Sequence, residues 1–211
     1  MFTEKLDIQL LESLEENGLI ESTGLQHACI PKIKSGRDVI CMADNGTGKS
    51  TTIVISVLNK LKASLDDNPR ALIVVADKEK AAAMKSEFDR LGSYTDLRVH
   101  TACDDGKIND QKDEIYMGSD VVIGTAKRLN QIYTLYALNL TVLKIFAIDD
   151  ADLIIKSTNY LQIDRLAESI PRTQKIVFTS QMNDWVSRFV DEFTNAEDVL
   201  EFGDDEEDIN E

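Results

Sequence analysis

Two short stretches far apart in the sequence carry side chains that could handle a nucleotide. One reads Ala43-Asp44-Asn45-Gly46-Thr47-Gly48-Lys49-Ser50, and the other reads Asp149-Asp150-Ala151-Asp152. The first combines two glycines with a lysine and a hydroxyl group, which is typical of a loop that wraps phosphates. The second places carboxylates directly after an apolar stretch, where a Mg²⁺ ion beside those phosphates would need oxygen ligands. Together the two stretches indicate a protein that handles ATP.

The glycine-containing stretch has a physical reason for each of its residue types. Gly46 and Gly48 let the backbone turn tightly and bring its N–H groups toward an anion without a side chain in the way. The Lys49 ammonium could reach the β- and γ-phosphates, and the Ser50 hydroxyl could bind Mg²⁺. A helix that starts near Lys49 would add its positive N-terminal dipole. We therefore expect the nucleotide to contact Asn45, Gly46, Thr47, Gly48, Lys49, Ser50 and Thr51.

An alternative is open for this stretch. The strict phosphate-loop pattern begins with glycine, whereas the first residue here is Ala43. The stretch could instead be a glycine turn before a helix that happens to begin with Lys49 and Ser50. The apolar run before it, the helical pattern after it and the acidic cluster downstream favour nucleotide binding.

Composition and charge limit the classes of protein to which the chain can belong. Of its 211 residues 43% are hydrophobic, which is enough to build a core and excludes a wholly disordered chain. The net charge is −15, and the stretch 203–211 contributes six acidic residues and no basic one. The remainder is acidic as well, so any affinity for nucleic acid must come from a local patch or be weak. We expect 203–211 to be a solvated, disordered tail.

The sequence lacks the signals of a membrane span, a signal peptide, a disulfide framework and a zinc site. No apolar run approaches the roughly 20 residues that span a bilayer, so no membrane contact is expected. The first residues lack the basic and apolar blocks of a signal peptide. Cys29, Cys41 and Cys103 form neither a disulfide framework nor a paired zinc-ligand spacing. A reducing, cytoplasmic location is the simplest expectation.

Amphipathic and apolar segments alternate along the chain, which predicts helices and buried strands in turn. The expected strands are 39–42, 71–75, 97–101, 120–123, 143–148 and 175–179, and the expected helices are 6–14, 25–33, 53–61, 81–91, 126–137, 160–169 and 182–193. This alternation predicts an α/β fold with a mostly parallel sheet and helices on both faces. Right-handed crossovers then gather the carboxyl ends of the strands, and with them both motifs, along one ligand-binding edge.

With both motifs and their spacing in hand, the chain resembles the N-terminal RecA-like domain of DEAD-box ATP-dependent RNA helicases over nearly all of residues 2–200. The resemblance implies a single RecA-like P-loop NTPase domain over 1–202 that binds ATP and Mg²⁺. Segment 1–37 would be the helical adenine-recognition segment, and 38–202 the P-loop core. Phe2, Gly18 and Gln26 fall close to that segment's aromatic, glycine and glutamine, so the Gln26 amide would read the adenine edge.

The same resemblance implies roles at the nucleotide. The family's own loop also begins with alanine, and Asp149-Asp150-Ala151-Asp152 stands where the family has Asp-Glu-Ala-Asp. Asp149 would hold Mg²⁺ through water beside Ser50. Asp150 would orient or deprotonate the attacking water and, with Lys49 and Asp149, form the catalytic set.

Further roles connect this site to RNA. Thr179-Ser180-Gln181 replaces the family's Ser-Ala-Thr, and Asp152 would couple the nucleotide site to Thr179 and Ser180. Gly124-Thr125-Ala126-Lys127-Arg128 looks like the family's RNA-contacting Thr-Pro-Gly-Arg. Weak contacts with single-stranded RNA are therefore expected at Lys78, Thr125 and Arg128.

Several residues depart from the family pattern. Asp150 is one methylene shorter than the expected glutamate, and a misplacement of about 1 Å can lower a rate about 100-fold, so slow hydrolysis is expected. Leu19 replaces a stacking aromatic residue. Asp77 lies beside Lys78, and Asp104-Asp105-Gly106 replaces a glycine pair, so both changes add negative charge on the RNA-facing side.

Three hypotheses follow. The leading one is a slow ATPase in RNA metabolism that needs a partner protein to supply the family's second RecA-like domain, because a missing arginine finger lowers turnover by roughly 10³–10⁵. The second is a catalytically degenerate protein-interaction module that binds nucleotide without turnover. The third, a phosphate-loop kinase for a small substrate, explains the loop but neither Gln26 nor the Asp-x-Ala-Asp pattern.

Overall fold

The computed structural model describes residues 6–156, 158–170 and 172–203. The strands are β1 Val39–Ala43, β2 Ala71–Val74, β3 Val99–Ala102, β4 Val121–Gly124, β5 Ile145–Ile148, β6 Gln174–Thr179 and β7 Val199–Phe202. The helices are α1 Ile8–Glu16, α2 Gly24–Lys34, α3 Lys49–Leu61, α4 Lys78–Leu91, α5 Ile108–Tyr116, α6 Ala126–Thr134, α7 Ala151–Ile154, α8 Tyr160–Glu168 and α9 Asp184–Phe193. Phe2 and the expected tail beyond Gly203 lie outside the described residues.

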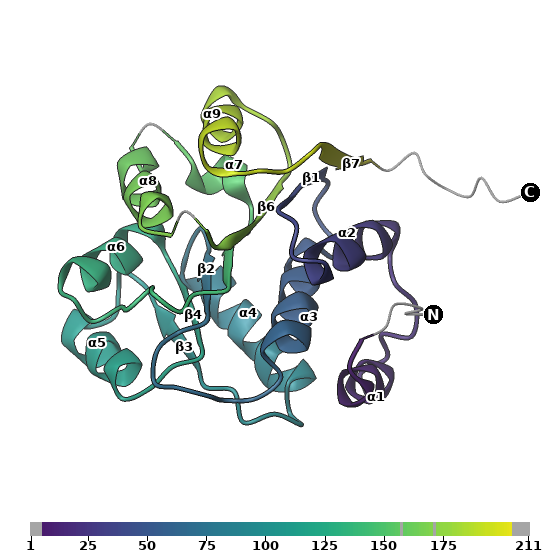
Figure 1. Cartoon of the computed structure of the whole chain (residues 1–211), viewed down its shortest axis with the longest axis horizontal. Helices are drawn as coiled ribbons and strands as arrows, with labels where there is room; N and C mark the ends of the chain where they lie inside the picture. Colours follow the sequence, from purple (N-terminus) through teal and green to yellow (C-terminus); the bar gives the residue numbers. More distant parts are fainter. Residues whose placement is uncertain (1–5, 157, 171, 204–211) are drawn as a thin grey trace, which may run out of the picture.

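The seven strands form a single parallel sheet in the order β3-β4-β2-β5-β6-β1-β7 (Figure 1). Because every pairing is parallel, all carboxyl ends of the strands lie at one edge. The central strands β2, β4, β5 and β6 are buried along their whole length. The α/β fold with a parallel sheet, predicted from the apolar runs, is confirmed.

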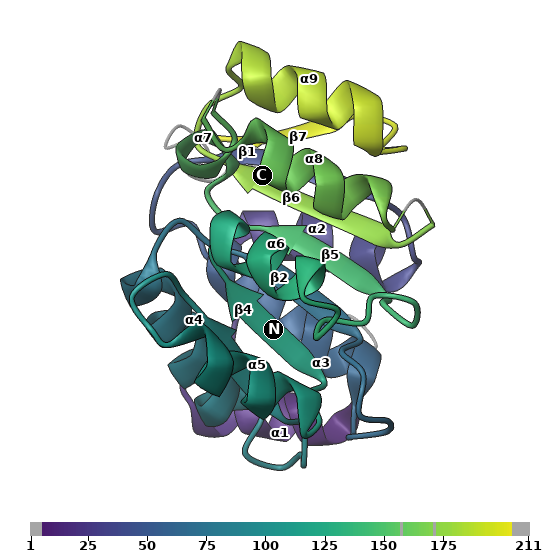
Figure 2. The same ribbon diagram turned by 90° about the vertical axis from the view of Figure 1, so that its left-hand side faces the viewer.

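Helices cover both faces of the sheet and form two apolar cores (Figures 1 and 2). Alternate residues of one strand contribute to different cores: Ile73 packs with α1–α4, whereas Leu72 and Val74 pack with α6, α8 and α9. Figure 2 looks onto the second of these faces. Burial on both faces explains why these strands are continuously apolar in sequence.

The structure adds three elements to those expected from the sequence. α5 buries only Ile115, so its sequence lacks a clear apolar stripe. α7 is a single turn after β5. β7 lies at the edge of the sheet, pairs with β1 alone and is only half-buried, so it lacks the apolar run of a central strand.

Helix boundaries follow local capping chemistry. α4 begins three residues before its expected start because the side chain of Asp77 caps it by accepting from Lys80 N. α6 ends three residues before its expected end, and Tyr136 beyond it has a positive φ of 58°. Across the described residues, every helix is too short or too polar to cross a bilayer.

Candidate nucleotide and RNA site

The candidate site lies along the carboxyl edge of the sheet. The phosphate loop connects β1 to α3, and Asp149 directly follows β5. Strand β6, which ends at Thr179, lies between β1 and β5. Strand β2 lies on the other side of β5, and α4 begins shortly after it. The parallel topology therefore brings the predicted motifs to one edge.

The glycines of the loop are required by its backbone. Gly46 and Gly48 have φ values of 89° and 93°, in the left-handed region that disfavours a side chain. A Cβ at Gly48 would lie 2.9 Å from Nε2 of Gln26. Gly48 is therefore needed both for the turn and for the close approach of α2.

The α2 helix is fastened to the loop at its first turn. Thr23 and Gln26 form a capping box, in which Thr23 N donates to Gln26 Oε1 at 3.0 Å. The Thr23 hydroxyl in turn donates to Thr47 O at 3.0 Å. The structure thus places Gln26 beside the loop, with its amide oxygen engaged and its amide nitrogen toward Gly48.

Lys49 lies folded against its own loop. Its ammonium donates to the carbonyl oxygens of Ala43 at 2.6 Å and Asp44 at 3.0 Å. The Lys49 side chain is buried, and its Nζ lies 4.0 Å from Oδ1 of Asp150. A lysine held in this way supplies positive charge inside the loop without a carboxylate at hydrogen-bond distance.

Other expected nucleotide contacts lie around the loop. Asn45 is exposed at its tip, and the Thr47 hydroxyl donates to Asp44 O at 2.9 Å. The Thr51 hydroxyl turns toward α4, where it donates to Glu87 Oε1 at 3.4 Å. Of these residues, Thr51 is therefore the one whose side chain points to a neighbouring helix.

Ser50 and Asp149 meet across the site. The Ser50 hydroxyl donates to Oδ2 of Asp149 at 2.5 Å. Oδ1 of Asp149 is buried and has no hydrogen-bond partner. Burial raises the pKa of the Asp149 carboxyl, and the hydrogen bond from Ser50 opposes this rise.

These two side chains fit a magnesium ion. They offer a hydroxyl oxygen and an unpartnered carboxylate oxygen at the place where the loop would hold phosphates. Within the described ranges, no group of three or more His, Cys, Asp or Glu side chains forms a metal cage. A site with few protein ligands is typical of Mg²⁺, which keeps waters and shares substrate phosphates.

Asp150 has an unusual backbone and two cationic neighbours. Its φ of 57° and ψ of 55° are left-handed, a conformation that clusters at functional sites in non-glycine residues. Its Oδ2 accepts from the ammonium of Lys80 at 2.7 Å. This hydrogen bond is the main cause of a raised Lys80 pKa.

Asp152 joins the ends of β5 and β6. Its Oδ1 accepts from the Thr179 hydroxyl and from Ser180 N, each at 2.9 Å, and its Oδ2 accepts from the Ser180 hydroxyl at 2.7 Å. Burial acts to raise the pKa of Asp152, but the bonds from Ser180 and Thr179 outweigh it and hold the pKa below its usual range. The three side chains that the resemblance assigns to coupling are thus in direct contact.

The three expected RNA contacts are paired within the chain. Lys78 forms an ion pair of 2.7 Å with Asp105, which is the main cause of a raised Lys78 pKa. The Thr125 hydroxyl donates to Asp104 Oδ2 at 3.2 Å. Arg128 is buried and donates to the carbonyl oxygens of Gly106 and Asp104 at 2.8 and 2.6 Å. The acidic loop 104–106 therefore engages every one of these three groups.

Sequence reasoning missed two participants. Thr23 was readable as the start of a capping box, Thr23-Gly24-Leu25-Gln26. The second is Lys80, which no local pattern could pair with Asp150, because that contact depends on β2 lying beside β5.

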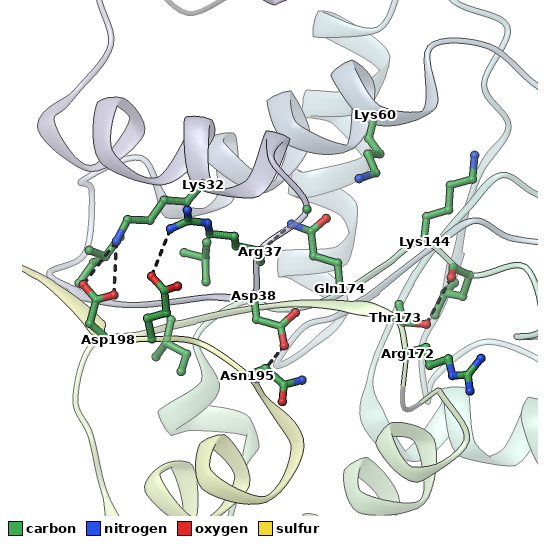
Figure 3. A pocket seen from close by; sticks show the side chains of 16 residues that line it. Lys32, Arg37, Asp38, Lys60, Lys144, Arg172, Thr173, Gln174, Asn195 and Asp198 are labelled. Atoms are coloured by element: carbon green, nitrogen blue, oxygen red, sulfur yellow. Dashed lines mark hydrogen bonds and ion pairs between the residues drawn. The ribbon is translucent and has the colours of Figure 1, made fainter.

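A separate cavity lies at the opposite, amino-terminal edge of the strands (Figure 3). Its volume is about 570 Å³, and its lining includes the starts of β1 and β6 but no residue of the phosphate loop. Gln174 in its wall donates to the carbonyl oxygens of Ile33 and Arg37. At its rim Lys32 pairs with Asp198 and Arg37 pairs with Glu197. This cavity is distinct from the candidate nucleotide site.

Known proteins were similar to this chain over most of its length. The family model described as DEAD/DEAH box helicase matches residues 23–189. The DEAD-box ATP-dependent RNA helicase CshA of Streptococcus pneumoniae serotype 4 is 27% identical over 192 residues, which are 90% of this chain and 36% of that protein. Eukaryotic initiation factor 4A of Caenorhabditis elegans is 26% identical over 176 residues, 83% of this chain and 44% of that protein. The chain spans less than half the length of these relatives.

Solved structures share the RecA-like fold. A DEAD box protein from the hyperthermophile Methanococcus jannaschii has a TM-score of 0.88 at 17% identity, over 94% of this chain and 55% of that chain. A variant of S. cerevisiae Dbp5 bound to Nup159, Gle1, IP6 and ADP has a TM-score of 0.82 at 20% identity, over 93% of this chain and 52% of that chain. Taken with the family match over most of the sequence, these likenesses lead to one conclusion: the chain belongs to the DEAD/DEAH box helicase family.

Proposed function

We propose that the chain binds Mg²⁺-ATP at the carboxyl edge of its sheet and hydrolyses it slowly, as the N-terminal RecA-like half of an RNA helicase. The contact between Ser50 and Asp149 carries this proposal. It unites the two expected Mg²⁺ ligands from separate elements and leaves one carboxylate oxygen without a partner. Membership of the DEAD/DEAH box helicase family supports ATP as the nucleotide.

The residues of the chain divide the work of binding. Ser50 and Asp149 would hold the Mg²⁺ ion, which would supply positive charge to neutralise the phosphates. Lys49 exchanges its two carbonyl partners for phosphate oxygens. Gln26 is held beside the loop by Thr23 and presents its amide to the adenine.

Asp150 and Asp152 have different roles. Asp150 acts on the attacking water, and Asp152 connects the nucleotide site to β6. Asp150 orients the water, but its side chain is a methylene shorter than glutamate, and turnover is therefore slow. Asp152 carries the state of the nucleotide site to β6 through Thr179 and Ser180.

Unwinding and RNA contact require more than these residues supply. A second RecA-like domain, from a partner protein, would add the arginine finger and the other half of the RNA channel. Single-stranded RNA would bind weakly at Lys78, Thr125 and Arg128, because each is already engaged by the loop 104–106. A cytoplasmic location stays a prediction.

A non-catalytic, nucleotide-binding interaction module is the second candidate. The observation that favours it is the engagement of Asp150 by Lys80, which takes one oxygen of the carboxylate that would handle water. The intact Lys49, Ser50, Asp149 and Gln26 favour the enzyme.

Both candidate functions require nucleotide binding, which titration of fluorescent ATP in the presence of Mg²⁺ tests. We expect saturable binding that Lys49→Ala abolishes and that Lys60→Ala, at the other end of α3, leaves intact. Phosphate release with and without single-stranded RNA then separates the two. RNA-stimulated release lost in Lys49→Ala supports the enzyme, whereas tight binding with no release over hours supports the module.

A further inference from the structure

We infer that Lys80 is a positioning residue for hydrolysis: its ammonium holds the Asp150 carboxylate so that the other carboxylate oxygen faces the phosphate loop. This inference rests on the proposed function, because it concerns the same nucleotide site. It assigns to α4 a part in a reaction whose other protein groups come from the loop and the end of β5.

The two side chains of this ion pair, Lys80 and Asp150, differ in how deeply they are buried. The Asp150 side chain is 7% exposed and that of Lys80 is 45% exposed, so the lysine reaches inward from the surface to a buried acid. Oδ2 accepts from Lys80 at 2.7 Å, and Oδ1 lies 4.0 Å from Nζ of Lys49. The two oxygens therefore have different surroundings: one is tied to α4, and the other faces the loop lysine.

The place of Lys80 in its helix is not explained by helix stability. It lies in the first turn of α4, where the helix dipole opposes a cation. Its backbone N–H is fixed by Asp77, which caps the helix at 2.8 Å. Because β2 and β5 are neighbours, this turn starts beside the end of β5, from which Asp150 projects.

The pairing also suits the short side chain of Asp150. Phosphoryl transfer depends mainly on positioning and charge stabilisation, so a carboxylate must point in one direction to orient water. The left-handed backbone of Asp150 sets the direction in which its side chain leaves the main chain, and the hydrogen bond from Lys80 holds its carboxylate. When Lys49 moves to a phosphate, Oδ1 is left free to accept a hydrogen bond from the attacking water.

Single-turnover phosphate release at saturating Mg²⁺-ATP tests this role, alongside the dissociation constant for fluorescent ATP. We expect Lys80→Met to slow release about 10- to 100-fold, as for a misplacement of about 1 Å, with ATP affinity changed less than threefold. Lys80→Arg, which keeps the charge and the donor, should retain most of the rate. Lys85→Met is the matched control, because it removes an exposed lysine of the same helix from its pair with Asp89.

The outcomes separate this inference from the proposed function. If the unsubstituted protein binds no ATP, the proposed function fails. If it binds ATP but releases no phosphate, the proposed hydrolysis fails, and the positioning role fails with it. If it releases phosphate and Lys80→Met does so as fast or faster, the positioning role alone is overturned. Lys80→Arg keeps a positive charge and a hydrogen-bond donor. If it loses as much of the release rate as Lys80→Met does, the positioning role is also overturned, because charge and donor at this position then do not sustain the rate.

Discussion

The Thr179 hydroxyl at the end of β6 donates to the Asp152 carboxylate beyond the end of β5 at 2.9 Å. Ser180 adds two more hydrogen bonds to the same carboxylate. Both Asp152 and Thr179 are buried. These bonds tie the segment that follows β5 to the end of the neighbouring strand β6.

Replacing Asp152 by alanine should therefore weaken the fold without emptying the nucleotide site. Hydrogen bonds to a charged group each contribute about 1.5–3 kcal/mol, so the free energy of unfolding should fall by about 2 kcal/mol or more. Urea unfolding would measure the loss, and fluorescent-ATP titration should show an affinity changed only a few-fold. Ser180→Ala should lose less, because Thr179 keeps its bond. Equal losses in the two variants would contradict this account.

Gly48→Ala should impair both folding and nucleotide binding. Its φ of 93° is unfavourable for alanine by about 1 kcal/mol, and the new methyl would press on Gln26. Gly36→Ala is the control, since Gly36 has a φ of 86° but open space around its Cβ direction. Both variants should melt at lower temperature, and ATP affinity should fall in Gly48→Ala alone. A normal affinity in Gly48→Ala would show that the loop tolerates the displacement of Gln26.

Asp120 should be a stability residue whose contribution depends on pH. It is fully buried, and it accepts from Arg70 at 2.6 Å and from Arg98 Nε at 3.0 Å. Although burial acts to raise its pKa, the bonds from Arg98 and Arg70 hold the pKa below its usual range. Removal of one partner of a buried pair costs about 3–5 kcal/mol, so Asp120→Asn should destabilise by that order at neutral pH.

The sign of this pH dependence follows from the lowered pKa. An unfolded aspartate titrates near pH 4, so the stabilisation by Asp120 is complete above about pH 4 and is lost as the pH falls through the lower folded pKa. Urea unfolding of the unsubstituted protein and of Asp120→Asn would be measured from neutral to acidic pH. The difference between their free energies of unfolding should shrink only at the acidic end. A difference that shrinks on the alkaline side of neutrality would contradict the assignment.

Asp150→Glu should speed phosphate release. The added methylene restores the reach expected at this position, and a gain of up to about 100-fold corresponds to relief of a misplacement of about 1 Å. Stopped-flow phosphate release, with the dissociation constant for ATP as the companion measurement, would report it. A flat rate would mean that the reach of the side chain at position 150 does not limit phosphate release.

Asp105→Asn should tighten binding of single-stranded RNA. The change releases Lys78 from its 2.7 Å pair and removes a negative charge beside the proposed RNA contacts. At low salt we expect a gain of a few-fold that declines as salt rises, because phosphate contacts depend on counterion release. Asp89→Asn removes an equally exposed charge from α4, at its pair with Lys85, and should leave RNA binding unchanged. Equal gains in both variants would point to net charge alone.

Local patterns carried most of the sequence prediction. The run Ala71-Leu72-Ile73-Val74-Val75 predicted a buried strand because both faces of β2 are covered. The sequence does not predict β7, because this strand pairs on one side only and alternates between half-buried and exposed positions, so it has no apolar run. The sequence predicts Ser50 and Asp149 as ligands of one Mg²⁺ ion at a shared sheet edge, because the glycine loop and the acidic cluster each follow a strand and parallel strands end together. Their direct hydrogen bond is a finding of the structure.

Contacts that depend on the order of strands could not be read from the chain. The strand order places the end of β2, shortly after which α4 begins, beside the end of β5, and only then do Lys80 and Asp150 meet. In the same way, the resemblance suggested that Asp104 and Asp105 repel RNA. Their engagement of Thr125 and Lys78 depends on the strand order β3-β4-β2, which brings the segments after these three strands together.

The cavity beside Gln174 and the phosphate loop lie at opposite ends of the same parallel strands. A small molecule lodged in that cavity would leave a fluorescent nucleotide seated in the loop. Inhibitor screens that follow nucleotide displacement would overlook such compounds, whereas screens that follow melting temperature would register them.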